Sequence, residues 1–193
     1  MKSGLLLHAC CAPCATVTVE EYARAGHEPT LFFHNPNIHP YMEFQRRLRA
    51  LEEWASLQGI PLTTDQGYPL EENVAMLLSG NPRCAICFGE RLAATALKAS
   101  EAGFSAFGTT LSVSPYQDQE LILRAGAEAG HRYGVEFIYI DCRPRYRDSV
   151  HISRTLGMYR QPYCGCVFSE RDRYRQERKN VASKGIDSAP KKD

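Results

Sequence analysis

The regular alternation of short apolar runs with longer amphipathic segments is the feature that most constrains the fold of this chain. The runs that predict strands are Leu5–Leu7, Thr30–Phe33, Ile60–Thr64, Phe104–Thr110 and Glu136–Ile140. The segments that predict helices are Ala15–Ala25, Tyr41–Gln58, Glu71–Leu78, the second half of Cys84–Ala102, and Asp118–Tyr133. Such alternation is typical of an α/β fold, with helices on both faces of a mainly parallel sheet.

The length of the chain favours one such domain. We expect its 193 residues to form a three-layer domain over residues 1–178. Residues 179–193 are small, polar and charged, which predicts a disordered tail. Within the domain, Phe44, Leu48, Leu51 and Ala55 recur at helical spacing and predict the buried stripe of the longest helix.

The loops that leave the carboxyl ends of the predicted strands hold the chemically unusual residues. These loops cover residues 10–14, 34–37, 109–115 and 141–143. Ligands of parallel sheets bind outside the carboxyl ends of the strands. We therefore expect the four loops to converge on one site.

Eight cysteines fall into three groups and one isolated position. The groups are Cys10, Cys11 and Cys14; the C-x-x-C pair Cys84 and Cys87; and the C-x-C pair Cys164 and Cys166. Cys142 stands alone after an apolar strand, and we expect it to be a buried packing residue. Thiolates are soft ligands that suit iron–sulfur clusters and zinc, so the grouping predicts metal or redox chemistry.

Three alternatives remain open from the cysteines alone. A disulfide framework is disfavoured because a chain of this size can bury a full core without bridges. A structural zinc usually joins two knuckles about 15–20 residues apart, whereas the C-x-x-C pairs here lie on either side of two strands and a long helix. A thiol–disulfide oxidoreductase that uses Cys11 and Cys14 leaves Cys84 and Cys87 unexplained.

Other signals limit the location and the ligand class. The sequence has neither an apolar run of about 18 residues nor a signal-peptide pattern, so we expect a cytoplasmic protein without a membrane partner. It also lacks a glycine-rich phosphate loop, which argues against classical nucleotide binding. Residues 143–193 hold 13 Lys and Arg against 6 Asp and Glu. This basic end suits either an anionic partner or a solvated surface.

Five sequence blocks, in order, resemble one family. They are residues 6–14 (LLHACCAPC), 33–38 (FHNPNI), 83–87 (RCAIC), 109–116 (TTLSVSPY) and 159–166 (YRQPYCGC). Together they resemble the cobalamin-independent epoxyqueuosine reductases, the QueH family. The resemblance implies a Rossmann-like fold of the PP-loop ATPase and HUP type, in which the cysteine loop replaces the phosphate loop. Around Cys142 the match is weaker, because an aromatic residue is expected there.

The resemblance also implies the reaction and its cofactor. Epoxyqueuosine in a tRNA anticodon is reduced to queuosine, the last step of that modification, with electrons from an unidentified donor. It implies a [4Fe–4S] cluster on Cys10, Cys11, Cys84 and Cys87, although Cys14 could replace Cys10. The pair Cys164 and Cys166 is implied to be redox-active. An additional iron is implied nearby, for which Cys14 is our candidate ligand, and Asp141 is a further candidate catalytic residue.

A tRNA substrate gives the basic end a role. Arginines supply phosphate contacts and tyrosines supply stacking surfaces for the bases of a single-stranded loop. The candidate RNA-binding residues are Arg143, Arg160, Arg171, Arg173 and Arg175. The competing interpretation of the whole chain is a structural iron–sulfur or zinc protein without redox turnover, such as a nucleotide-binding-like module.

Overall fold

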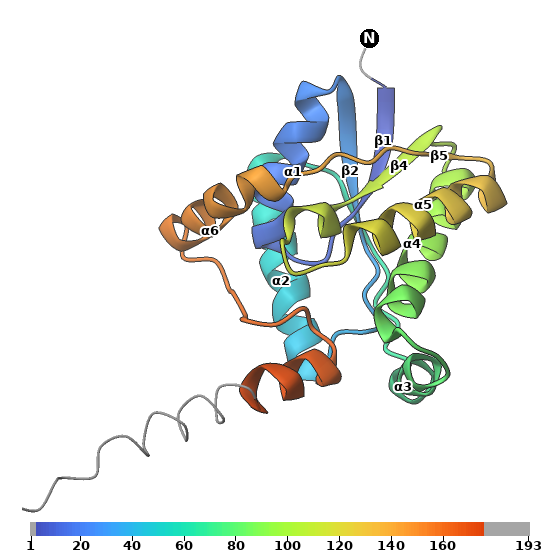
Figure 1. Ribbon diagram of the computed structural model, residues 1–193. Helices are drawn as coiled ribbons and strands as arrows, with labels where there is room; N and C mark the ends of the chain where they lie inside the picture. Colours follow the sequence, from blue (N-terminus) through green and yellow to red (C-terminus); the bar gives the residue numbers. More distant parts are fainter. Residues whose placement is uncertain (1–2, 176–193) are drawn as a thin grey trace, which may run out of the picture.

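The computed structural model describes residues 3–175 and contains a five-stranded sheet in which every strand pair is parallel. The strands are β1 (Ser3–His8), β2 (His27–Phe33), β3 (Leu62–Thr64), β4 (Ala106–Thr109) and β5 (Glu136–Phe137), in the order β3-β2-β1-β4-β5 (Figure 1). The strand order reverses beside β1. The predicted α/β class is confirmed, and the predicted tail over residues 179–193 lies outside the described residues.

Helices cover both faces of the sheet (Figure 1). On one face lie α1 (Ala12–Arg24) and α2 (Tyr41–Gln58), with α6 (Tyr146–Thr155) packed on α1. On the other face lie α4 (Arg83–Glu101) and α5 (Gln119–Tyr133), with α3 (Leu70–Leu78) beside α4. Two 3-10 turns, Thr110–Val113 and Arg143–Arg145, follow the carboxyl ends of the last two strands.

The alternation of side chains along β1 explains why both faces need a cover. Leu5 and Leu7 point into the core beneath α1 and α2, whereas Leu6 points into the core beneath α4 and α5. All three are at most 1% exposed. A strand that is buried on both faces needs apolar residues at every position, and Leu5–Leu7 is such a continuous apolar run.

The structure corrects three expectations. Helix α4 begins at Arg83, so the whole segment from Cys84 is helical and not only its second half. Strand β5 ends at Phe137, earlier than expected, although Ile138 N still donates to Phe107 O at 2.9 Å. Helix α6 was not expected, because its fully buried positions are small serines, Ser149 and Ser153, which give no apolar periodicity.

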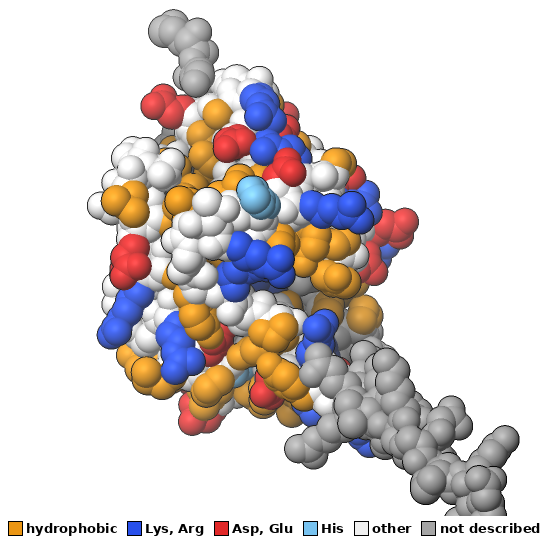
Figure 2. Space-filling model, turned by 90° about the vertical axis from the view of Figure 1, so that its left-hand side faces the viewer, with side chains coloured by type: hydrophobic (Ala, Val, Ile, Leu, Met, Phe, Trp, Pro, Cys, Tyr) orange, Lys and Arg blue, Asp and Glu red, His pale blue; other side chains and the backbone are white. Residues whose placement is uncertain are grey.

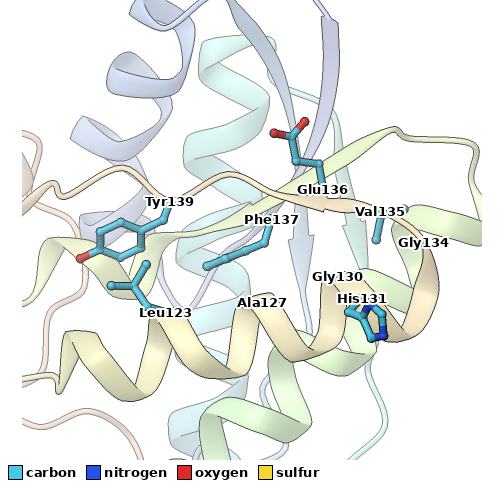
Figure 3. A pocket seen from close by; sticks show the side chains of 9 residues that line it. All are labelled: Leu123, Ala127, Gly130, His131, Gly134, Val135, Glu136, Phe137 and Tyr139. Carbon is cyan, nitrogen blue, oxygen red and sulfur yellow. The ribbon is translucent and has the colours of Figure 1, made fainter.

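The molecule also has an open hollow between α5 and β5 at the edge of the sheet (Figure 3). Its lining includes Leu123, Val135, Phe137 and Tyr139 but none of the cysteines. Among residues 3–175, no helix combines the length and the apolar character that crossing a bilayer requires.

Candidate metal centre and dithiol

Cys10, Cys11 and Cys14 form a compact thiol triad where β1 passes into α1. Cys11 caps the helix in an extended conformation, and a proline in the first turn favours helix initiation there. The three sulfur atoms lie within 4.8 Å of one another. Cys10 and Cys11 are buried, and Cys14 is partly buried. Three adjacent thiols that are largely shielded from water can hold a metal centre.

Neighbouring strand ends hold this loop in place. Cys10 N donates to Thr110 Oγ1 at 3.1 Å, and the same hydroxyl donates to Cys10 Sγ at 3.5 Å. Asn35 Nδ2 donates to Ala9 O at 2.9 Å, and His8 Nδ1 lies 3.1 Å from Thr109 Oγ1. The loops after β1, β2 and β4 therefore meet as expected.

The fourth loop is split between the core and the surface. Cys142 is fully buried beside Val17 and Val113, with Cys14 packed against the same cluster, which agrees with a packing role. Asp141 lies at the surface, where its carboxylate accepts from Arg143 Nε at 2.8 Å and Nη2 at 2.6 Å. The catalytic role suggested for Asp141 stays a proposal, and its charge is already paired.

The surroundings of the triad favour one thiolate. Hydrogen bonds from Cys11 and Cys14 hold the pKa of Cys10 well below its usual range, and the partnership with Cys10 raises the pKa of Cys11 and Cys14. Burial lowers the pKa of His8 to about 3, so this imidazole is neutral at physiological pH. The thiolate is the form of cysteine that ligates metals.

The second cysteine pair, Cys84 and Cys87, lies on the first turn of α4, where positions i and i+3 share one face. Cys84 is exposed, and Cys87 is buried with its pKa raised by burial to about 11. Phe88 and Leu92, later on the same helix, belong to the same apolar cluster as Cys10 and Cys11. The start of α4 and the triad thus border one core, although among the described residues the sulfurs within 4.8 Å of one another are those of Cys10, Cys11 and Cys14.

The third pair lies on a tight loop that leads into the helical residues 167–175. Cys164 and Cys166 are free thiols, so no disulfide joins them in this structure. The hydrogen bond from Cys166 lowers the pKa of Cys164 to about 5, and Ser169 Oγ lies 3.1 Å from Cys164 Sγ. Gly165 between them has φ = +127°, a conformation that L side chains rarely adopt.

A buried ion pair on α2 anchors that loop. Arg47 and Glu43 are 1% and 5% exposed, and Arg47 Nε donates to Glu43 Oε1 at 2.7 Å. Arg47 Nη1 also donates to the carbonyl oxygen of Cys164 at 2.8 Å. Tyr159 donates its hydroxyl to Glu43. Sequence reasoning assigned no role to Arg47, because a charged residue of an amphipathic helix normally faces water.

His34 is a second residue to which the sequence assigned no functional role. Its Nδ1 lies 2.7 Å from Asp65 Oδ2 and its Nε2 lies 2.6 Å from Glu90 Oε1. Burial disfavours the charged ring, but hydrogen bonds and charges of Glu90 and Asp65 outweigh it and raise the pKa of His34. His34 therefore favours the protonated form more than a free imidazole does, and it lies at the same edge of the sheet as the cysteines.

Contacts within the protein engage at least three of the five candidate RNA-binding arginines. Arg143 pairs with Asp141 and Arg171 with Asp172, while Arg160 donates to Val150 O at 3.0 Å. Arg173 and Arg175 are exposed on the helical residues 167–175. Figure 2, which views the side of the molecule that carries α6, shows Lys and Arg in separate groups between apolar and acidic side chains.

Comparisons with known proteins agree with the architecture of the site. The family model described as epoxyqueuosine reductase QueH matches residues 5–172. The epoxyqueuosine reductase QueH of Dehalococcoides mccartyi is 40% identical over 177 residues, which cover 90% of this chain and 96% of that protein. The corresponding Thermotoga maritima protein is 34% identical over 175 residues, covering 86% and 89%.

Among solved structures, a predicted subunit of a tRNA methyltransferase from Methanocaldococcus jannaschii has a similar fold. The TM-score is 0.51 at 14% identity, over 78% of this chain and 74% of that one. At this identity the likeness concerns the fold alone. Residues 5–172, which the family model matches, include all eight cysteines.

Proposed function

The chain belongs to the epoxyqueuosine reductase QueH family, and from that premise we propose that it reduces epoxyqueuosine in tRNA to queuosine. The observation that carries the proposal is the thiol triad at the carboxyl edge of the sheet, in a chain that matches the family model over residues 5–172. Conversion of the epoxide to an alkene consumes two electrons and two protons and releases water. Because protein side chains alone cannot supply such electrons in turnover, the reaction needs a redox centre.

The residues present fit an iron–sulfur cluster. A cubane cluster takes four thiolates, and we propose Cys10, Cys11, Cys84 and Cys87 as these ligands. Support comes from the packing of the α4 helix next to Cys10 and Cys11, and from the soft sulfur donor set. When bound, a [4Fe–4S] cluster supplies single electrons at a potential that its surroundings set. Cys14 is left as a ligand for an additional iron.

Cys164 and Cys166 are proposed as a dithiol that exchanges electrons with the centre. Cys164 is exposed, and its low pKa gives a reactive thiolate at neutral pH. The ring that a C-x-C disulfide closes is small, and strained disulfides are easily reduced. Differential alkylation with mass spectrometry should find both thiols in the reduced protein and a loss of both together after oxidation. Thiols that stay free under every redox condition would exclude this role.

His34 is proposed as the proton source. Its two ring nitrogens face Asp65 and Glu90, at the edge of the sheet where the cysteines lie. A general acid must carry a proton that it can give up, and the raised pKa of His34 favours the protonated ring.

The RNA is proposed to bind along the arginines named above and their neighbouring tyrosines. Arg173 and Arg175 are exposed on the helical residues 167–175, and Tyr174 between them is exposed as a stacking surface. Since tRNA is the proposed substrate, we propose that the protein acts in the cytoplasm, with an electron donor still to be identified.

The direct experiment is turnover of the anaerobically prepared protein on tRNA that carries epoxyqueuosine, without cobalamin and with a chemical reductant. Nucleoside mass spectrometry should record queuosine in place of epoxyqueuosine. Cys142→Ala is the matched control, because that cysteine packs with Val17 and Val113 and is not a proposed ligand. Absence of queuosine from a protein whose centre is intact and reduced would refute the proposed function.

A further inference from the structure

Helix α4 carries a second buried arginine whose charge the protein leaves unpaired. Arg91 is 3% exposed and follows Cys87 by one helical turn. Its Nε donates to Cys87 O at 3.2 Å, and its guanidinium lies 5.7 Å from the centre of the Phe88 ring. Among residues 3–175, no carboxylate lies within 4.0 Å of this guanidinium.

Arg47, the other buried arginine described above, has a structural role and provides a comparison for Arg91. Arg47 is paired with Glu43 at 2.7 Å and donates to backbone carbonyls of the C-x-C loop. Arg91 has no equivalent of Glu43. The adjacent acid, Glu90, directs its Oε1 to His34 Nε2 at 2.6 Å. A buried charge without a partner is strongly unfavourable, so an anion must balance Arg91.

The position of Arg91 is set by the helix, because Arg91 lies one turn beyond Cys87 and donates to the Cys87 carbonyl oxygen. Burial disfavours its charge, but Cys87, Cys10, Cys164 and Glu90 together raise the pKa of Arg91. On the β1 side the neighbouring ring is His8, which is neutral. The cation thus lies directly beside Cys87, one of the proposed ligands.

We propose that Arg91 is the counter-charge of the metal–thiolate centre and raises its reduction potential. This inference rests on the proposed function, because it takes Cys10 and Cys87 to be ligands of the cluster. A cluster with four thiolate ligands becomes more negative when it accepts an electron. A fixed positive charge beside it stabilises the reduced form more than the oxidised form, and net charge near a cluster is one of the factors that set its potential.

Two substitutions separate charge from shape. Arg91→Met keeps an unbranched side chain in the apolar surroundings and removes the charge, whereas Arg91→Lys keeps the charge. Arg49→Met removes the same charge from an exposed position of α2 and serves as the matched control. The midpoint potential of the cluster is measured by reductive titration without tRNA, together with iron and sulfide content and the circular dichroism of the metal-free proteins.

We expect Arg91→Met to disfavour cluster reduction at least tenfold, which is about 59 mV for one electron. Arg91→Lys should move the potential less, and Arg49→Met should leave it unchanged. If Arg91→Met folds but assembles no cluster, the proposal requires that Arg91→Lys still assembles one.

An unchanged potential in Arg91→Met, or an equal shift in both Arg91 variants, would overturn the proposal. Failure of metal-free Arg91→Met to fold would also overturn it, since Arg91 would then serve the fold. These measurements use no substrate. They can therefore contradict the role of Arg91 while turnover supports the proposed function, and the reverse outcome is equally distinguishable.

Discussion

Replacement of Arg47 should lower the free energy of unfolding, because it leaves Glu43 buried without its cationic partner. Arg47→Met breaks the 2.7 Å ion pair and also removes the donors to the Cys164 and Tyr163 carbonyls. Both side chains of the pair are almost inaccessible to water, at 1% and 6% exposure, so solvent does not screen the interaction.

The magnitude follows from that burial. Breaking a buried pair on one side costs about 3–5 kcal/mol of unfolding free energy. For a chain of this size, about 2–4 °C of melting temperature correspond to each kcal/mol, so the midpoint should fall by roughly 6–20 °C. The double variant Glu43→Met/Arg47→Met removes both charges and should recover part of the loss.

The assay is urea denaturation of the metal-free protein under reducing conditions, applied as a double-mutant cycle. Groups in direct contact in one network give a coupling energy of about 0.5–3 kcal/mol, and we expect this pair near the upper end. A single-variant loss below about 1 kcal/mol, or losses that simply add in the double variant, would refute the buried-pair argument.

Three further predictions concern other parts of the site. Cys142→Ala should keep parent-like iron and sulfide content, since this thiol is buried in a separate apolar cluster; loss of iron would make it a ligand. His34→Gln should destabilise the protein most at acidic pH: the folded pKa of His34 is raised, so its contribution is fully present below the unfolded value of about 6.5 and disappears as pH rises through the folded pKa. Denaturation at pH 5.5 and 9 measures this, and an equal loss at both values would contradict the paired imidazolium. Replacing Arg171, Arg173 and Arg175 by Gln should weaken tRNA binding and flatten its salt dependence by about 0.7–0.9 per lost phosphate contact, with the visible spectrum unchanged; an unchanged salt slope would move the RNA surface elsewhere.

The sequence predicts well those parts of the fold in which buried apolar residues recur at regular spacing. Helix α2 occupies Tyr41–Gln58 as expected, because its stripe is clear and Gly59, with φ = 65°, ends it. The fully buried helix positions of α6 are small serines, so periodicity could not reveal it. The cysteine groups were visible as residue types at short spacings, and topology explains why the loops after β1, β2 and β4 meet.

The parts of the site that sequence reasoning missed are charged groups paired or buried by tertiary contacts. Arg47 precedes Leu48 of the predicted stripe, but nothing local indicates that Glu43 neutralises it in the core. His34 gains its proton-holding character from Asp65 and Glu90, which lie 31 and 56 residues away in sequence. Arg91 resembles any helical arginine until the fold buries it one turn beyond Cys87.

The most direct test of the central claim is the iron and acid-labile sulfide content of the anaerobically purified protein beside that of Cys87→Ser. Cys87 is buried on the first turn of α4, and we propose it as one of four thiolate ligands. The account predicts a brown parent protein with about four iron and four sulfide per chain, apart from any additional iron, and a variant that folds but loses them. A colourless parent that contains zinc, or a Cys87→Ser protein with full iron and sulfide content, would contradict it.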